Sequence, residues 1–102
     1  FVDWTKIARI NSFDLVINTV PSAAAAKVAD DFQGVPVLLD ALYSPWLPPL
    51  SLIQGKTHGE LITGLDLLCA QALAQLELMT KIEFDHVFMF QKLRDHAANL
   101  VG

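Results

Sequence analysis

Gly64–Thr80 reads GLDLLCAQALAQLELMT, and the rest of the chain is organised around this stretch. It contains no Pro and no Gly after Gly64, and Ala, Leu, Gln, Glu and Met, which all favour helices, dominate it. Thr63 is a candidate N-cap, and Asp66 in the first turn complements the positive end of the helix dipole. Because apolar residues cover nearly every face, we expect a buried helix.

Gln71 stands in the middle of this apolar helix. Seven residues make almost two turns, so Gly64 and Gln71 share a face, which Gln75 continues one turn further on. A buried amide without a partner costs roughly 1–3 kcal/mol. The amide of Gln71 is therefore expected to bond either to a nearby loop or to a ligand, and spacing alone favours the loop.

Two short apolar runs upstream predict strands of a parallel sheet. Asp14–Thr19 (DLVINT) and Val35–Asp40 (VPVLLD) lack the alternation of a half-exposed strand, so we expect both to be buried on two faces. Between them, Ser22 is a candidate N-cap for a helix over Ala23–Asp30. Strand, helix and strand over this length form one βαβ unit, which predicts an α/β fold.

The other segments are predicted to be irregular or helical. Three prolines make Ser44–Leu50 an extended loop, and Ser51–Ile62 is expected to hold a short helix and a loop with two glycines. A last helix is expected from an N-cap at Asp85 to about Asn99. Its apolar residues exceed a single stripe, so part of this helix is expected to meet another domain or subunit.

Polar residues stand where the two predicted strands end. In open α/β sheets, ligands bind outside the carboxyl ends of the strands, and these ends are Asn18–Pro21 and Asp40–Tyr43. Tyr43 is consistent both with a core residue whose hydroxyl is satisfied and with a residue that reaches a ligand. Asn18 and Tyr43, together with Gly64 and Gln71, predict part of an α/β ligand-binding domain, without indicating a reaction.

Composition bounds the function further. The chain has 102 residues, of which 53% are hydrophobic, and a formal net charge of −4. Without a Lys/Arg cluster nucleic acid is not an expected partner, and no apolar window is long enough to predict a membrane span. The single Cys allows no disulfide within the chain, which fits a cytoplasmic protein.

Motifs for several common reactions are missing from the sequence. It contains no GxGxxG, no P-loop and no nucleophile elbow. Cys69 and the three scattered histidines, His58, His86 and His96, do not make a zinc site, so no metal is predicted.

Three segments in order resemble the C-terminal half of shikimate dehydrogenase. Asp14–Pro21 (DLVINTVP) is similar to a strand and an N-T-x-P turn of that family. Leu38–Leu50 (LLDALYSPWLPPL) is similar to its strand, Asp, Tyr and x-P-x-x-T-P-L loop, and Gly64–Ala72 (GLDLLCAQA) to its G-L-x-M-L-x-x-Q-A helix. Order and spacing agree from Asp14 to about Thr80.

This resemblance implies that residues 1–102 form the second half of a Rossmann-like nucleotide-binding domain, with one βαβ unit and C-terminal helices. It implies an oxidoreductase that reduces 3-dehydroshikimate to shikimate with NADPH in aromatic amino-acid (chorismate) biosynthesis. The resemblance assigns substrate binding to Tyr43 and Gln71, so that a group of shikimate would form the hydrogen bond that the Gln71 amide needs. The NADP cofactor is assigned to Asn18, Thr19, Val20, Ala41 and Gly64.

The sequence departs from the family at three places. Pro21 runs into Ser22 where the family often has a Leu-Gly-Met type of loop, Pro48 replaces the Thr of T-P-L, and Ala41 stands where Met is common. The family's catalytic Lys and Asp belong to its N-terminal domain, and its glycine-rich phosphate loop belongs to the first half of the nucleotide domain. No catalytic residue is therefore assigned here, and we expect the chain alone to be inactive and to self-associate.

Two other functions are consistent with these departures. One is a quinate/shikimate dehydrogenase-like paralogue that uses NAD, because the residues that choose between the cofactors belong to the nucleotide-binding half that this sequence lacks. The other is a non-catalytic domain that keeps the fold and binds a small metabolite as a regulator.

Overall fold

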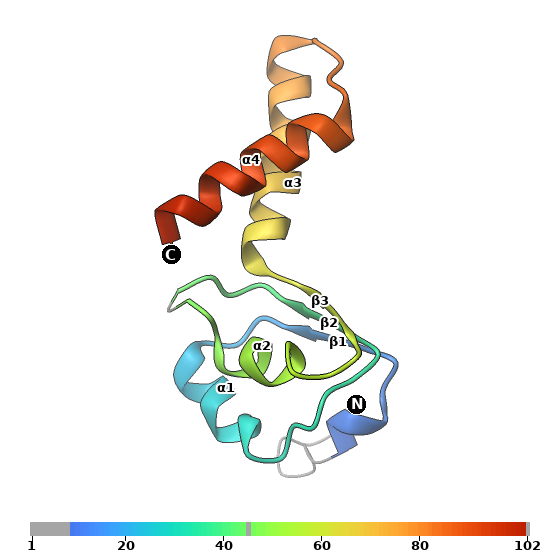
Figure 1. Cartoon of the computed structure of the whole chain (residues 1–102), viewed down its shortest axis with the longest axis vertical. Helices are drawn as coiled ribbons and strands as arrows, with labels where there is room; N and C mark the ends of the chain where they lie inside the picture. The colour runs from blue at the N-terminus through green and yellow to red at the C-terminus, as the bar shows by residue number, and fades with distance from the viewer. Residues whose placement is uncertain (1–8, 45, 102) are drawn as a thin grey trace. The chain divides into compact units, whose positions relative to one another are not determined.

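The computed structural model describes residues 9–44 and 46–101. The chain divides into two compact units, one up to Thr63 and one from Gly64. A parallel sheet with two helices forms the first unit, and two longer helices form the second (Figure 1). The predicted α/β class is thereby confirmed. Pro45, in the predicted extended loop, lies outside the described residues.

The first unit is a three-stranded sheet with α1 and α2 on one face (Figure 1). Its elements are β1 (Leu15–Asn18), α1 (Ser22–Ala29), β2 (Val37–Asp40), α2 (Pro49–Gln54) and β3 (Glu60–Ile62). The strands are parallel and lie in the order β1-β2-β3. The sequence did not predict β3, because three residues after a glycine-containing loop are too few to show a periodic pattern.

Prolines precede both helices of this unit. The prediction that Ser22 caps α1 is wrong: Pro21 is the N-cap residue, and the Ser22 hydroxyl donates to the carbonyl of Ser44 at 3.4 Å. Pro48 likewise precedes α2, which begins at Pro49 inside the predicted extended loop. A proline in the first turn forfeits no helical hydrogen bond, because the first amides have no acceptor within the helix.

The core of the first unit lies between the sheet and its two helices. Leu38, from the central strand, is completely buried, and Leu50 from α2 is nearly so. The buried cluster consists of Val28, Phe32, Val35, Leu38 and Leu50. Burying a side chain of this size is worth about 1.5–3 kcal/mol, so this cluster contributes to the stability of the unit.

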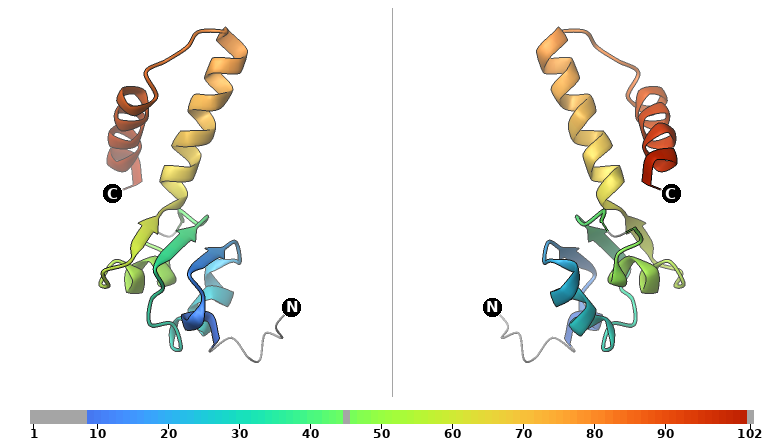
Figure 2. Two further views of the ribbon diagram at one scale, coloured as in Figure 1. Left: turned by 90° about the vertical axis from the view of Figure 1, so that its right-hand side faces the viewer. Right: turned by 90° about the vertical axis from the view of Figure 1, so that its left-hand side faces the viewer.

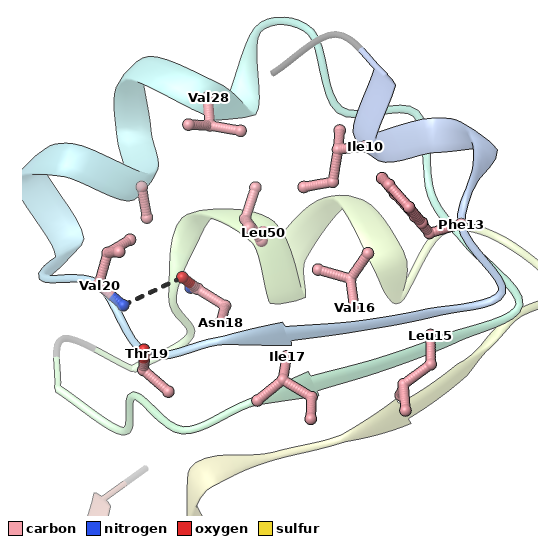
Figure 3. A pocket seen from close by; sticks show the side chains of 11 residues that line it. Ile10, Phe13, Leu15, Val16, Ile17, Asn18, Thr19, Val20, Val28 and Leu50 are labelled. Atoms are coloured by element: carbon pink, nitrogen blue, oxygen red, sulfur yellow. Dashed lines mark hydrogen bonds between the residues drawn. The ribbon is translucent and has the colours of Figure 1, made fainter. Parts of the chain in front are cut away.

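The opposite face of the sheet is not covered by the helices of the first unit. Leu15 and Ile17 point away from α1 and α2 (Figure 3) and are 53% and 58% exposed. Ile62 on β3 is also exposed. The prediction of strands buried on both faces is therefore wrong for these residues. The apolar character of both faces is typical of strands that are covered on two sides, but the helices of the first unit cover only one.

The second unit is a pair of helices, α3 (Gly64–Thr80) and α4 (His86–Val101), which run in opposite directions and pack together (Figure 2). Asp85 Oδ1 accepts a hydrogen bond from the Phe88 amide at 3.1 Å, so the predicted N-cap is confirmed.

The burial of α3 is narrower than predicted. The expectation of a helix buried all round is wrong, because α3 buries a single stripe with Leu65, Cys69 and Leu73 and exposes Leu68 and Leu76.

Candidate functional site

The carboxyl ends of β1 and β2 lie side by side in the first unit. Asn18, the last residue of β1, is in register with Asp40, the last residue of β2. The Ala41 amide donates to the carbonyl of Asn18 at 2.9 Å, which extends the pairing by one residue. The structure thus brings together the predicted cofactor positions of both strands, Asn18, Thr19, Val20 and Ala41.

Asn18 is buried, and its side chain shapes the turn that follows β1. Its amide nitrogen Nδ2 donates to Asp40 Oδ1 at 3.1 Å. Its Oδ1 accepts from the Val20 amide at 3.3 Å, the bond drawn in Figure 3. Its amide oxygen and nitrogen therefore both have partners within the protein. Thr19, by contrast, is exposed, so this turn presents Thr19 and the adjacent backbone to an approaching molecule.

Asp40 is the functional candidate that sequence reasoning missed. Its side chain is completely buried, and its two oxygens accept three hydrogen bonds. Oδ1 accepts from Asn18 Nδ2 and from the Leu42 amide at 3.2 Å, and Oδ2 accepts from the Ser51 hydroxyl at 2.8 Å. The available signal was an acidic residue at the end of an apolar run, because a buried carboxylate requires donors around it.

Tyr43 follows β2 and is 49% exposed. This exposure rules out the interpretation of Tyr43 as a core residue. Its hydroxyl makes no hydrogen bond with the residues that the structure describes, so it is available to a ligand.

The remaining two candidates, Gly64 and Gln71, belong to the second unit. Gly64 is buried as the first residue of α3, whereas Gln71 is exposed on the same helix. The prediction of a buried Gln71 amide is wrong, because α3 buries only one stripe. The interpretation in which Gln71 bonds to a nearby loop has no support among the described residues, and its amide is open to solvent.

Comparisons with known proteins identify the kind of enzyme that this chain resembles. No family model matches the sequence, and no curated protein does. A shikimate dehydrogenase from Mycobacterium tuberculosis is 32% identical, with a TM-score of 0.77 over 88% of this chain and 35% of that one. The predicted likeness to shikimate dehydrogenase is confirmed.

A second solved structure agrees. The shikimate 5-dehydrogenase from Mycobacterium fortuitum is 35% identical, with a TM-score of 0.69 over 85% of this chain and 32% of that one. The chain therefore spans about a third of the length of these two shikimate dehydrogenases.

A cavity of about 370 Å³ runs along β1 (Figure 3). It is lined by Ile10, Phe13, Leu15, Val16, Ile17, Asn18, Thr19, Val20, Ala25, Val28 and Leu50. Only Asn18 and Thr19 are polar, so most of its wall offers nothing to a charged dinucleotide, whose binding site needs well-placed polar groups. The cavity therefore follows the outer edge of β1, and only one end of the cavity reaches predicted cofactor residues, namely Asn18, Thr19 and Val20.

The described residues do not support a cysteine nucleophile, a metal site or a membrane-spanning helix. Burial raises the pKa of the Cys69 thiol, which keeps it protonated at neutral pH and makes it a poor nucleophile. Within residues 9–44 and 46–101, no three His, Cys, Asp or Glu side chains gather closely enough to hold a metal ion. No helix of this part of the chain has both the length and the apolar character that crossing a membrane requires.

Proposed function

We propose that this chain is part of an enzyme that reduces 3-dehydroshikimate to shikimate with NADPH in aromatic amino-acid biosynthesis. The observation that carries the proposal is the pair of strand-end turns, in register at Asn18 and Asp40, in a chain 32% identical to a shikimate dehydrogenase. The catalytic Lys and Asp and the phosphate-binding loop that the family resemblance implies would belong to other parts of the same polypeptide.

The proposed cofactor contacts are made by the turns after β1 and β2. Thr19 is exposed, and Val20 and Ala41 are partly exposed, so a nicotinamide ring can reach the backbone and small side chains of both turns. Asn18 contributes by fixing the shape of the first turn through its bond to the Val20 amide. NADPH, when bound, supplies the hydride, and these residues orient its reactive ring.

Tyr43 and Gln71 are the proposed substrate residues. Shikimate carries hydroxyl groups and a carboxylate, which a phenol and a carboxamide recognise by donating and accepting hydrogen bonds. The Tyr43 hydroxyl makes no hydrogen bond with the described residues, and the Gln71 amide is solvent-accessible within the second unit. Both side chains therefore have donors to offer to a polar substrate.

We also propose that the rest of a longer polypeptide covers the open side of the sheet. Leu15 and Ile17 are more than half exposed there, and the edge of β1 away from β2 lies along an apolar cavity. An apolar sheet face with side chains this exposed is unusual for the surface of a monomeric protein. The matched part of this chain is only about a third of either similar enzyme, so both contain enough additional chain to cover it.

A growth experiment tests the proposed function. Bacteria that lack shikimate dehydrogenase need aromatic amino acids, and we expect the complete reading frame around this sequence to remove that need. Residues 1–102 alone, expressed as a control, should not do so. If the complete protein accumulates in folded form and growth still requires the amino acids, the proposed reaction is wrong.

Pro48 keeps the quinate-using alternative open. It stands where the resemblance places the Thr of the T-P-L loop, and it is fully buried as the residue that precedes α2. A buried proline offers no side-chain hydrogen bond to a substrate, so recognition at this loop must differ from that family's pattern. Comparing shikimate with quinate as substrates decides between the two enzymes.

A further inference from the structure

We infer that Asp40 is a positioning residue whose carboxylate holds together the two turns that the proposed function assigns to cofactor and substrate. Its kinetic consequence rests on the proposed function, whereas its structural consequence does not.

The three hydrogen bonds to Asp40 come from three different parts of the first unit. Asn18 Nδ2, at the end of β1, donates at 3.1 Å, and the Leu42 amide, in the turn after β2, donates at 3.2 Å. The Ser51 hydroxyl on α2 donates at 2.8 Å. Loss of the carboxylate would therefore release the end of β1, the turn after β2 and the adjacent helix at once.

Packing alone does not explain this carboxylate. Asp40 is completely buried, and among the residues that the structure describes no Lys, Arg or His forms an ion pair with it. Burying such a group is costly, and an apolar residue of similar size would fill the same space without that cost. The three donors offset this cost. In return, the carboxylate fixes the positions of the three groups that donate to it, and this fixing explains why a carboxylate stands here.

The bond to Asn18 extends the influence of Asp40 to the first turn. Because Asp40 engages Nδ2, the Oδ1 of Asn18 is turned toward the Val20 amide, from which it accepts at 3.3 Å. The bond to the Leu42 amide fixes the backbone between Ala41 and Tyr43. One carboxylate thus orders the turn after β1, which is proposed to contact the cofactor, and the backbone that leads to Tyr43, which is proposed to contact the substrate.

The experiment compares Asp40→Asn with Ser51→Ala in the complete protein. Asp40→Asn is isosteric but leaves one acceptor oxygen and replaces charge-assisted bonds with neutral ones, which are about half as strong. Ser51→Ala removes only the bond from α2. Amide hydrogen exchange is measured in peptides that cover residues 18–21 and 41–44, and KM and kcat are measured for NADP and for shikimate.

We expect Asp40→Asn to accelerate exchange in both peptides and to raise the KM for NADP about tenfold, with a smaller change in kcat. Ser51→Ala should leave both readouts within about twofold, even where it lowers the melting temperature. Asp40→Leu, which removes every acceptor, should exceed the effect of Asp40→Asn. If Asp40→Leu does not fold, Asp40→Asn decides alone.

Two results would overturn the inference: unchanged exchange in both peptides of Asp40→Asn, or equal changes in Asp40→Asn and Ser51→Ala. The unaltered protein separates this inference from the proposed function. Accelerated exchange in Asp40→Asn, with no turnover by the unaltered protein, supports the positioning role and removes the proposed reaction. Turnover by the unaltered protein, with normal exchange in Asp40→Asn, supports the proposed reaction and removes the positioning role.

Discussion

Arg94 on α4 donates from Nε to Asp66 Oδ1 in the first turn of α3, at 2.6 Å. The two side chains are only 22% and 26% exposed, so the pair is partly shielded from water. It ties the middle of one helix to the start of the other. The sequence identified Asp66 only as an acid suited to a helix start, because a partner 28 residues away leaves no local pattern.

Arg94→Ala should lower the free energy of unfolding by about 1–2 kcal/mol, because it leaves a partly buried carboxylate without this charged donor. Lys92→Ala is the matched control. Lys92 is exposed on the same helix, and its ammonium group lies 5.0 Å from the centre of the Phe88 ring. Such an exposed contact is worth about 0.5–1 kcal/mol at most. Urea unfolding measures both changes, and equal losses would mean that the Arg94–Asp66 pair contributes nothing specific.

Gly59→Ala should destabilise the first unit by roughly 1–3 kcal/mol. A Cβ at this position would collide with the carbonyl oxygen of Val35 and with Nε2 of Gln54. Neither atom can move freely. The fully buried Gln54 amide accepts from the Val35 amide at 3.0 Å and donates to the carbonyls of Val35 and Glu60 at 2.7 and 3.0 Å.

Gly55→Ala is the control for this prediction. Gly55 ends α2 with a helical φ of −63°, and a Cβ there would lie 3.3 Å from the carbonyl oxygen of Ser51. We expect a change within about 1 kcal/mol. Thermal unfolding of the two variants measures both changes in stability. If Gly59→Ala is as stable as the unaltered protein, the hydrogen bonds of Gln54 do not hold this loop in place.

Gln71→Ala in the complete protein should raise the KM for shikimate about tenfold, the effect of losing one hydrogen bond to an enclosed ligand. Because Gln71 is exposed within its unit, its removal should change stability by less than about 0.5 kcal/mol. Gln75→Ala, one turn further along the same face and also exposed, is the control and should leave KM unchanged. Identical steady-state kinetics for both variants would remove Gln71 from the substrate site.

The isolated chain should self-associate through the open face of its sheet. Light scattering of residues 1–102 should show a mass that grows with concentration, because exposed Leu15 and Ile17 are driven out of water. Ile17→Lys should reduce this association. Leu52→Lys, at an exposed position on α2 away from that face, should not. A monodisperse monomer at high concentration would contradict the prediction.

The sequence predicted those parts of the fold that local patterns encode. The structure contains strands within the predicted runs Asp14–Thr19 and Val35–Asp40, the long helix from Gly64 and the N-cap at Asp85. These features depend on residues close together in the chain, so composition and spacing carry them. The resemblance to shikimate dehydrogenase came from the same segments.

Features that depend on distant partners could not be predicted. The role of Asp40 requires Asn18 and Ser51, which approach it only after the sheet and α2 have formed. The exposure of Gln71 depends on which faces of α3 are covered, and an apolar sequence alone does not tell how many covers are present. β3 was missed because its pairing with β2, rather than its three residues, makes it a strand.

The most direct test of the central claim is turnover by the purified protein of the complete reading frame. Shikimate and quinate are each supplied with NADP and with NAD, and formation of the reduced cofactor is recorded. The account predicts that shikimate with NADP is oxidised with the highest kcat/KM of the four pairs. A folded protein that turns over none of the four would contradict it and would leave the regulatory metabolite-binding domain as the better explanation.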